Sequence, residues 1–295
     1  MSQTRTGTFP IGFRHGGSTW QQDLTALVAW ACQHRFLSID TGPLKPDELK
    51  QITEAGLKIG SVDLLQPWSA LVSPDPARRR DAAQANADYI RRVVPAGANV
   101  FFSVALPDEP HRDRAENLRF AVDGYGQLVQ SIKATGARIV LEGWPGGAPH
   151  YAALACTPES CRILFKEIGS NILGVNFDPS HLIRMGIDPV RFLAEFIDRV
   201  YHVHAKDTEM LDEAIYEYGH LQPAVAAQPH GWGGHAWRYT IPGHGQVRWS
   251  KLLSILTANQ YRGLLSIELE DENFNGTEEG EKRGLIASRD YLVHV

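Results

Sequence analysis

Eight short apolar runs alternate with helical patterns along the chain, and this alternation constrains the fold more than any other feature. The runs are rich in Val, Ile, Leu and Phe, as expected for strands buried on both faces of a parallel sheet. Eight strand–helix units predict a (β/α)8 TIM barrel, which 295 residues can form as a single domain spanning 1–295. An open doubly wound sheet is the alternative, but Gly12–Gly17 does not match the nucleotide-binding turn of that fold. The predicted strands are Phe9–Arg14, Phe36–Asp40, Lys58–Leu64, Val100–Ala105, Arg138–Glu142, Leu173–Asp178, Val200–His204 and Leu264–Glu268.

The predicted helices carry clear start and stop signals. Asp75, Thr157 and Asp188 each precede a proline, which places a capping side chain before proline at the first helical position. Gly56 and Gly136 stand where a helix should end before the next strand.

Composition narrows the classes of partner. Lys and Arg number 29 against 34 Asp and Glu, a net charge of −5, so a basic surface for nucleic acid is not expected. The three cysteines are sparse and indicate a reducing compartment. Because neither a secretory signal nor an apolar run of ~18–20 residues is visible, we expect a cytoplasmic protein with no membrane contact.

One segment, Thr208–Val247, interrupts the alternation between the seventh and eighth strands. It is long and irregular, and it holds Trp232, Trp237 and four histidines. Long structureless loops in compact domains are usually lids or binding loops. The sequence therefore predicts a lid-like insertion at 208–247.

Four consecutive predicted strands end in candidate metal ligands. These are Glu142, Asp178, His204 and Glu268. In a barrel the carboxyl ends of the strands meet at one mouth, and buried carboxylates there repel one another unless a cation lies between them. Three oxygen donors and one imidazole favour Mn²⁺, with Mg²⁺ or Co²⁺ as substitutes, and leave two positions for adjacent substrate oxygens.

Each residue also has a purely structural interpretation. A glutamate at a strand end can be salt-bridged, and Asp178 before Pro179 can cap a helix. The rings of His202 and His204 share one strand face and can be packed in the core. Glu270 and Asp271 can be solvated or lie behind the ligands. The joint pattern on four strands favours the metal site.

The order Leu-Glu142, Asp178-x-x-His181, His202-x-His204 and Ile-Glu268 resembles the xylose isomerase-like TIM barrels. That family includes sugar phosphate isomerases and epimerases, keto-sugar 3-epimerases and inosose-processing enzymes. The resemblance implies that the four candidates bind Mn²⁺ and that Glu142 and Glu268 double as acid and base on opposite faces of the substrate. It also implies that His181 contacts a substrate oxygen and that His202 supports its neighbour.

The chain departs from the keto-sugar epimerases, because no arginine follows His204 in Ala205–Met210. The long insertion, the Glu142-Gly-Trp-Pro-Gly-Gly motif and the His204-Ala-Lys-Asp-Thr-Glu run look closer to the branch acting on 3-keto-glycosides. This branch includes 3-keto-hexoside epimerases and the α-subunits of C-glycoside deglycosidases. It implies an oligomer and, for a deglycosidase, a small second subunit.

This site predicts one first step, removal of a proton α to the carbonyl of a keto-sugar, by Glu142, Glu268 or His181. Return of the proton gives epimerisation or isomerisation, and loss of a β leaving group gives a lyase. Trp144, Trp232 and Trp237 are candidates for stacking on a sugar or an aromatic aglycone, as are Trp20 and Trp68. Lys206 either contacts substrate or pairs with Asp207.

Two further classes are open. Endonuclease IV resembles the same barrel, but the acidic balance of this chain argues against a DNA-repair nuclease. A non-catalytic subunit on an inactive barrel is the other, and the intact set of candidate ligands argues against it.

Overall fold

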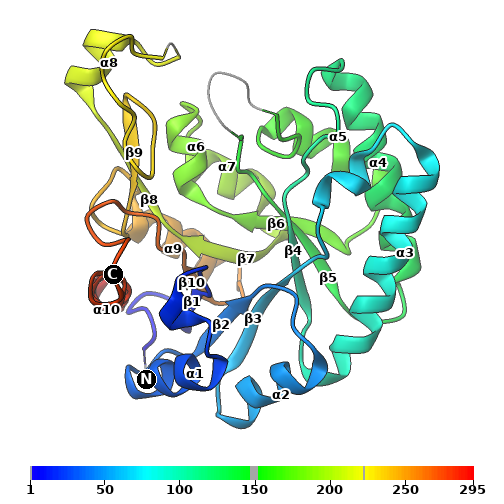
Figure 1. Ribbon diagram of the computed structural model, residues 1–295, viewed down its shortest axis with the longest axis horizontal. Coiled ribbons are helices and arrows are strands. Elements are labelled where there is room, and N and C mark those ends of the chain that lie inside the picture. The colour runs from blue at the N-terminus through cyan, green and yellow to red at the C-terminus, as the bar shows by residue number, and fades with distance from the viewer. Residues whose placement is uncertain (1, 147–151, 222) are drawn as a thin grey trace.

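The computed structural model describes residues 2–146, 152–221 and 223–295, so Gly147 of the Glu142–Gly147 motif lies outside the described residues. Eight parallel strands close into a barrel in the order β1-β10-β7-β6-β5-β4-β3-β2 (Figure 1). Their bounds are β1 Ile11–Arg14, β2 Ser38–Thr41, β3 Lys58–Asp63, β4 Val100–Ser103, β5 Arg138–Glu142, β6 Leu173–Phe177, β7 Val200–Ala205 and β10 Leu265–Ile267. All eight predicted strands and the (β/α)8 barrel are confirmed.

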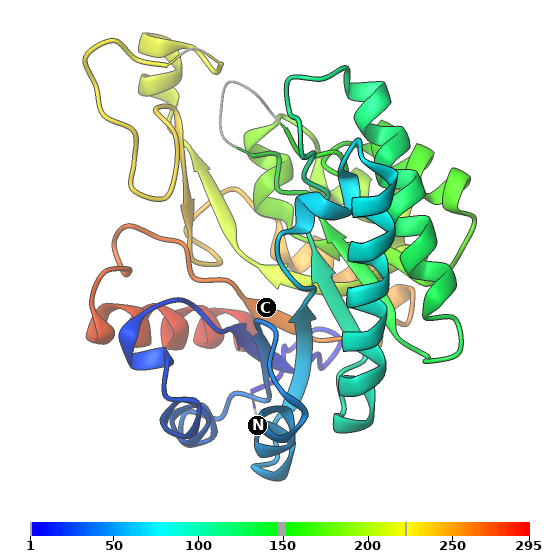
Figure 2. The same cartoon turned by 45° about the vertical axis from the view of Figure 1, so that its right-hand side comes forward.

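The helices pack around the outside of the barrel, with α3, α4 and α5 along one side (Figures 1 and 2). The capping residues Asp75, Thr157 and Asp188 accept hydrogen bonds from backbone N–H groups of the first helical turn, as predicted. Gly56 and Gly136 adopt positive φ angles of 88° and 76°, which a residue with a Cβ rarely adopts. The helices are α1 Leu24–Gln33, α2 Pro46–Glu54, α3 Pro76–Val93, α4 Arg114–Ser131, α5 Pro158–Ile168, α6 Pro179–Arg184, α7 Pro189–Phe196, α8 Asp212–Tyr218, α9 Trp249–Ala258 and α10 Glu278–His294, and the short 3-10 helices are Thr19–Gln21, Trp68–Val72, Val94–Ala96 and Ile197–Arg199.

Apolar side chains of the strands and of the inner helix faces form the main core, and a smaller cluster of buried residues contains Phe102, Val104, Val140 and Ala153. Ile11, Ile139, Leu173 and Leu265 are fully buried within the main core. Toward the carboxyl ends of β5, β6, β7 and β10 the buried residues become polar, which concentrates charged groups at one mouth of the barrel. Within the described ranges, no helix is both long and apolar enough to cross a membrane.

The expectation of an irregular insertion at 208–247 is wrong in part. Residues β8 Asp207–Met210 and β9 Trp237–Thr240 pair antiparallel as a two-stranded ribbon. The ribbon and α8 extend away from the barrel (Figures 1 and 2). This strand pairing could not be predicted from the sequence, because the two short strands are joined by a long connection without the tight turn that marks a hairpin.

The ribbon is fastened to the barrel at its base. Thr208 donates a side-chain hydrogen bond of 2.8 Å to the carbonyl of Ser180 in α6. The buried carboxylate of Asp207 accepts from the backbone N–H groups of Gly243 and Val247, where the chain returns toward α9. The proximal part of the insertion is therefore a fixed element of the site.

Candidate metal centre and active site

The four predicted ligands converge at the mouth of the barrel. Glu142 ends β5, Asp178 follows β6, His204 lies in β7, and Glu268 follows β10. These four strands are neighbours in the barrel, and one candidate ligand atom from each residue lies within 4.8 Å of the others. Glu142, Asp178 and His204 are buried.

Asp178 caps a helix and also faces the cluster of candidate metal ligands, so the structure agrees with both interpretations given from the sequence. Its Oδ1 accepts a 2.8 Å hydrogen bond from the backbone N–H of Ser180 and caps α6. Its Oδ2 is buried without a hydrogen-bond partner among the described residues, and it lies 3.3 Å from both His181 Nε2 and Lys206 Nζ. One oxygen thus holds the helix while the other faces the cluster.

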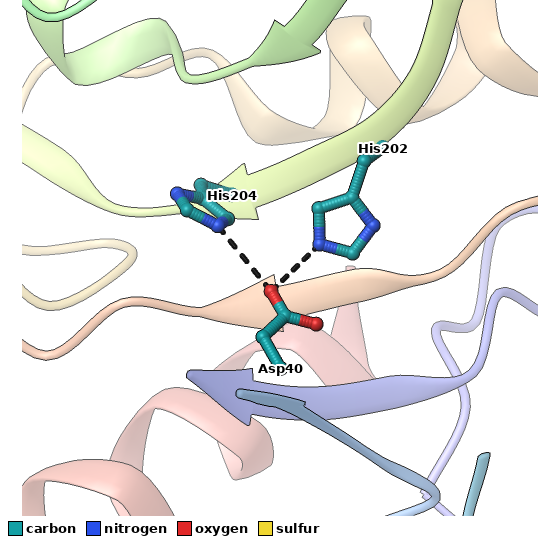
Figure 3. A group of neighbouring side chains, drawn as sticks. All are labelled: Asp40, His202 and His204. Carbon is teal, nitrogen blue, oxygen red and sulfur yellow. Dashed lines mark hydrogen bonds and ion pairs between the residues drawn. The ribbon is translucent and has the colours of Figure 1, made fainter. Parts of the chain in front are cut away.

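His204 is oriented by a carboxylate behind it. Its Nδ1 lies 2.7 Å from Glu142 Oε1 and 3.3 Å from Glu268 Oε2. Its Nε2 faces Asp40 Oδ2 at 3.3 Å, and His202 Nε2 donates to the same oxygen at 2.7 Å (Figure 3). A histidine whose second nitrogen faces a carboxylate is held in one ring orientation, as metal-binding histidines usually are.

Asp40, in β2, was not predicted from the sequence as a site residue. Its Oδ1 accepts from the backbone N–H of Ser61, and a Cβ at Gly60 would lie only 2.0 Å from that oxygen. Burial alone would raise the pKa of Asp40, but His202 and His204 hold that pKa well below its ordinary value. Asp40, His202 and His204 form a second group with ligand atoms within 4.8 Å, built around this carboxylate.

The ammonium of Lys206 lies among three carboxylates. It donates to Glu268 Oε2 at 2.5 Å and to Glu270 Oε2 at 2.7 Å, and it lies 4.5 Å from the ring centre of Tyr239. The expected alternative pairing with Asp207 is wrong, because that carboxylate faces the chain returning to α9.

The expectation for Glu270 and Asp271 is corrected in part. Glu270 is half-buried, and its carboxylate accepts a hydrogen bond from Lys206, which also binds Glu268. Asp271 is fully buried and accepts from the backbone N–H of Ile241, so it is not solvated.

His181 connects the ligand cluster to the insertion. Its Nε2 lies 3.4 Å from Glu142 Oε2 and has no hydrogen-bond partner among the described residues. Its Nδ1 lies 2.6 Å from the hydroxyl of Tyr239 in β9. Tyr239 does not belong to a recognisable sequence motif, so its place in the site was not predicted.

These groups surround a cavity of about 180 Å³. Arg14 lines it, forms a bidentate ion pair with Asp63 at 2.8 and 2.9 Å, and lies 4.5 Å over the ring of Phe102. Neither Arg14 nor Phe102 was predicted. The lining residues are Arg14, Trp68, Phe102, Val104, Glu142, Trp144, His181, Lys206, Glu268 and Glu270.

Two larger cavities adjoin this one. A cavity of about 740 Å³ shares Arg14, Glu268 and Glu270 with it, and a cavity of about 530 Å³ shares Trp144 and Glu270. Trp232 lines both larger cavities, and the mostly buried Trp237 lines the second. The three predicted tryptophans therefore lie at or beside the site. Trp20 does not line these cavities, and its indole N–H donates to Glu281.

A family model described as "Xylose isomerase-like TIM barrel" matches residues 24–292. The chain belongs to this family. Its relatives include the uncharacterized protein YfiH of Bacillus subtilis (strain 168), 30% identical over 154 residues, which cover 51% of this chain and 46% of YfiH. An inosose dehydratase of Clostridium botulinum (strain Alaska E43 / Type E3) is 23% identical over 92% of this chain and 91% of its own length.

Solved structures agree on the fold. The apo form of 3-keto-D-glucoside 4-epimerase from E. coli superposes with a TM-score of 0.66 at 15% identity, covering 96% of this chain and 98% of that one. Similarity at this level supports the barrel alone. The family membership makes the chain an enzyme of the xylose isomerase-like superfamily.

The donor set of this xylose isomerase-like barrel fits a divalent cation. The acidic side chains at the mouth outnumber the basic ones, Arg14 and Lys206, and such a buried excess of negative charge is costly without a counter-ion. Asp178 Oδ2 and His204 Nδ1 lack hydrogen-bond partners in the described structure, as ligand atoms would. Carboxylates with one imidazole are the donors that Mn²⁺ accepts. The acidic residues are Asp40, Asp63, Glu142, Asp178, Glu268 and Glu270.

Proposed function

We propose that the protein is an Mn²⁺-dependent isomerase or epimerase that abstracts a proton α to the carbonyl of a keto-sugar, with a 3-keto-glycoside as substrate. The observation that carries this proposal is the convergence of Glu142, Asp178, His204 and Glu268 beside a cavity of about 180 Å³. A bound cation would polarise the substrate carbonyl there. Mg²⁺ and Co²⁺ are the expected substitutes.

The chain supplies the groups that move the proton. Glu142 and Glu268 both line the cavity, and either carboxylate could accept the proton as the C–H bond breaks and its electron pair passes toward the carbonyl oxygen. The pairing of Glu268 with Lys206 and Arg14 disperses its charge, which makes Glu142 the stronger candidate for the base. For epimerisation, Glu268 would relay a proton to the other face, and the ammonium of Lys206, which donates a hydrogen bond to Glu268, would supply that proton.

His181 and Lys206 are positioned to bind substrate oxygens. His181 Nε2, which has no hydrogen-bond partner in the part of the chain that the structure describes, and the ammonium of Lys206 both border the cavity. Electrostatic stabilisation of the enediolate oxygens by such preorganised donors is an effective way to lower the barrier. Both residues therefore serve as substrate contacts in this proposal.

The adjoining cavities support a substrate larger than a free hexose. The inner cavity opens beside Trp144, and Trp232 lines both outer cavities. Tryptophan faces suit sugar rings and aromatic groups. A glycoside with its keto-sugar at the cluster and its aglycone among the tryptophans fits this arrangement.

A second candidate is a lyase that releases the aglycone of a 3-keto-glycoside, including C-glycosides, by β-elimination. The same base would break the C2–H bond, a C1–C2 double bond would form, and the C1–aglycone bond would break with its electron pair leaving on the aglycone. The similarity to inosose dehydratase, an enzyme named for elimination, favours this alternative. An oligomer, with a small second subunit in the lyase case, belongs to the same proposal, as do a cytoplasmic location and the absence of nucleic-acid and membrane partners.

The decisive experiment is proton NMR in D₂O with Mn²⁺-loaded protein and an aryl 3-keto-glucoside. Deuterium at the α carbon, or a new epimer with the aglycone retained, is expected for an isomerase or epimerase. Free aglycone with an unsaturated keto-sugar would establish the lyase instead. No exchange with this substrate, with free ketohexoses or with inososes would overturn both candidates.

Trp232 provides a sharper test of the substrate than Trp237. Trp232 is 39% exposed, so Trp232→Ala removes ring contacts without opening the core. Trp237 packs against Tyr239 and Arg184, so its removal would disturb the site directly. We expect Trp232→Ala to lower kcat/KM for aryl 3-keto-glucosides selectively, whereas equal losses on a bare keto-sugar would contradict an aglycone contact.

A further inference from the structure

Arg184, the last residue of α6, is a buried cation that forms no ion pair with a carboxylate of the described residues. It is 3% exposed, and its Nη2 donates to the carbonyl of Gly146 at 2.9 Å. Its guanidinium carbon lies 4.4 Å from the ring centre of Trp237. Among the described residues it makes no ion pair, and its Nε is buried without a hydrogen-bond partner.

The other cations near the site are arranged differently. Arg14 is paired with Asp63, and Lys206 is paired with Glu268 and Glu270. A buried charge is retained at a cost unless an opposite charge meets it. An arginine guanidinium at the wall of a cavity is suited to bind a planar or tetrahedral anion.

Arg184 lines the cavity of about 530 Å³ next to the reaction cavity. The volume lies in the range of about 300–1,000 Å³ typical of small-molecule sites. Its walls are aromatic, with Trp144, Trp232 and Trp237 as the largest side chains. The cavity thus combines flat apolar surfaces with a guanidinium that no carboxylate of the described ranges neutralises.

The cavity carries a negative charge at its inner end, next to the reaction cavity, and a positive charge at Arg184. Glu270 borders both this cavity and the reaction cavity, and its carboxylate is held by Lys206. A negative group on a ligand is repelled by Glu270 and attracted by Arg184. A bound anion should therefore lie on the Arg184 side, away from the metal cluster.

We propose that this cavity binds an aromatic group that carries an anionic oxygen substituent, with Arg184 holding the anion and the tryptophans contacting the ring. That this aromatic group is the aglycone of the substrate rests on the proposed function. It narrows the substrate class to 3-keto-glycosides whose aglycone is an acidic aryl group. Arg184 then determines specificity for the aglycone and takes no part in proton transfer.

Binding of fragments tests the site without turnover. Benzenesulfonate is a weak ligand for divalent cations, and methyl phenyl sulfone is a neutral analogue of similar shape. In ligand-detected NMR titrations of the Mg²⁺-loaded protein, we expect benzenesulfonate to bind at least about 10-fold more tightly, which corresponds to about 1.4 kcal/mol. Equal affinities of the two fragments, or no binding of either, would overturn the proposal.

Two variants separate the charge from the ring contacts. Arg184→Gln should weaken benzenesulfonate about 10-fold and leave the sulfone unchanged, whereas Trp232→Ala should weaken both to the same extent. Arg184→Lys keeps the charge and should restore part of the preference. If Arg184→Gln does not fold, the proposal is still tested by the preference of the wild-type protein for benzenesulfonate over the sulfone and by the affinity of Trp232→Ala for both fragments. A benzenesulfonate affinity that is unchanged in folded Arg184→Gln would contradict the role of Arg184.

A final comparison distinguishes this inference from the proposed function. If the fragments bind as expected but no keto-sugar exchanges deuterium, the anion site stands and the proposed reaction fails. If exchange occurs but 4-sulfophenyl and phenyl 3-keto-glucosides have equal kcat/KM in wild type and in Arg184→Gln, the reaction stands and the aglycone assignment fails.

Discussion

The hydroxyl oxygen of Tyr239 lies 2.6 Å from Nδ1 of His181, and this contact joins the β8–β9 ribbon to the reaction cavity. Both side chains are buried. Burial raises the pKa of Tyr239 above its ordinary value, so the hydroxyl keeps its proton at neutral pH. The hydroxyl therefore influences which nitrogen of His181 carries a proton and how Nε2 meets the substrate.

Tyr239→Phe removes this hydrogen bond while keeping the ring. An ordinary hydrogen bond is worth about 0.5–1.5 kcal/mol, so kcat should fall about 2- to 10-fold. The affinity for Mn²⁺ should not change, because the described hydrogen bond of the Tyr239 hydroxyl is to His181 and not to one of the four candidate ligands. Steady-state kinetics and a metal titration measure the two quantities.

The matched control is Tyr216→Phe, at a residue that is 87% exposed on α8, and it should behave as wild type. A Tyr239→Phe enzyme with normal kcat would show that the ribbon does not contribute to the reaction through His181.

The barrel was predictable because the signals for its strands and for its helices each lie within a few neighbouring residues. Apolar runs identify strands, and proline after Asp75, Thr157 or Asp188 identifies helix starts. The four candidate ligands were predictable because parallel strands bring their carboxyl ends to one mouth.

The remaining site residues were not predictable for a related reason. Asp40, Arg14 and Tyr239 act through partners distant in sequence, and none belongs to a short motif. Asp40 lies 162 residues before His202, and its position depends on the absence of a side chain at Gly60. The ribbon depends on pairing across a long connection, for which local spacing gives no signal.

Substitutions of Asp178 separate its two roles. Asp178→Asn retains an oxygen to cap α6 but loses the charge of Oδ2, so metal affinity should fall beyond the about 10- to 100-fold typical of residues that only support a ligand. Asp178→Ala should bind metal as poorly and also lose the cap, which is worth about 1 kcal/mol. Calorimetric metal titration and urea unfolding of the metal-free proteins measure these effects.

Asp188 offers the matched control, since it caps α7 and lies outside the cluster. Asp188→Ala should lose about 1 kcal/mol of stability relative to Asp188→Asn, with metal affinity unchanged. Wild-type metal affinity in Asp178→Asn would remove Asp178 from the ligand set.

Asp40→Asn tests the carboxylate behind His204. An amide cannot hold both imidazoles as an ionised carboxylate does, so His204 should lose its preferred ring orientation. We expect Mn²⁺ affinity to fall about 10- to 100-fold, as is typical when a residue that supports a metal ligand is replaced. Asp81→Asn, at an exposed position on α3, should leave the affinity unchanged. An unaltered affinity in Asp40→Asn would mean that the barrel alone orients His204.

Glu281, near the start of α10, fastens the segment Ser18–Gln21 at the edge of the 740 Å³ cavity. Its two carboxylate oxygens accept hydrogen bonds of 2.7 Å from the Ser18 hydroxyl and from the Trp20 indole N–H. Although burial alone would raise the pKa of Glu281, these donors lower it below its ordinary value. The ionised form is thus favoured in the folded state.

The sign of the pH dependence follows from this lowered pKa. The stabilisation is present above the unfolded-state pKa of about 4.3 and is lost as pH falls through the lower, folded-state pKa. Glu281→Gln should therefore be less stable than wild type by about 1.5 kcal/mol at pH 7, and the difference should shrink in acid. Urea unfolding at pH 7, 5 and 3.5 measures it, with the exposed Glu279→Gln as a control expected within about 0.5 kcal/mol of wild type. A difference that stays constant across this range would show that the hydrogen bonds do not depend on the charge of Glu281.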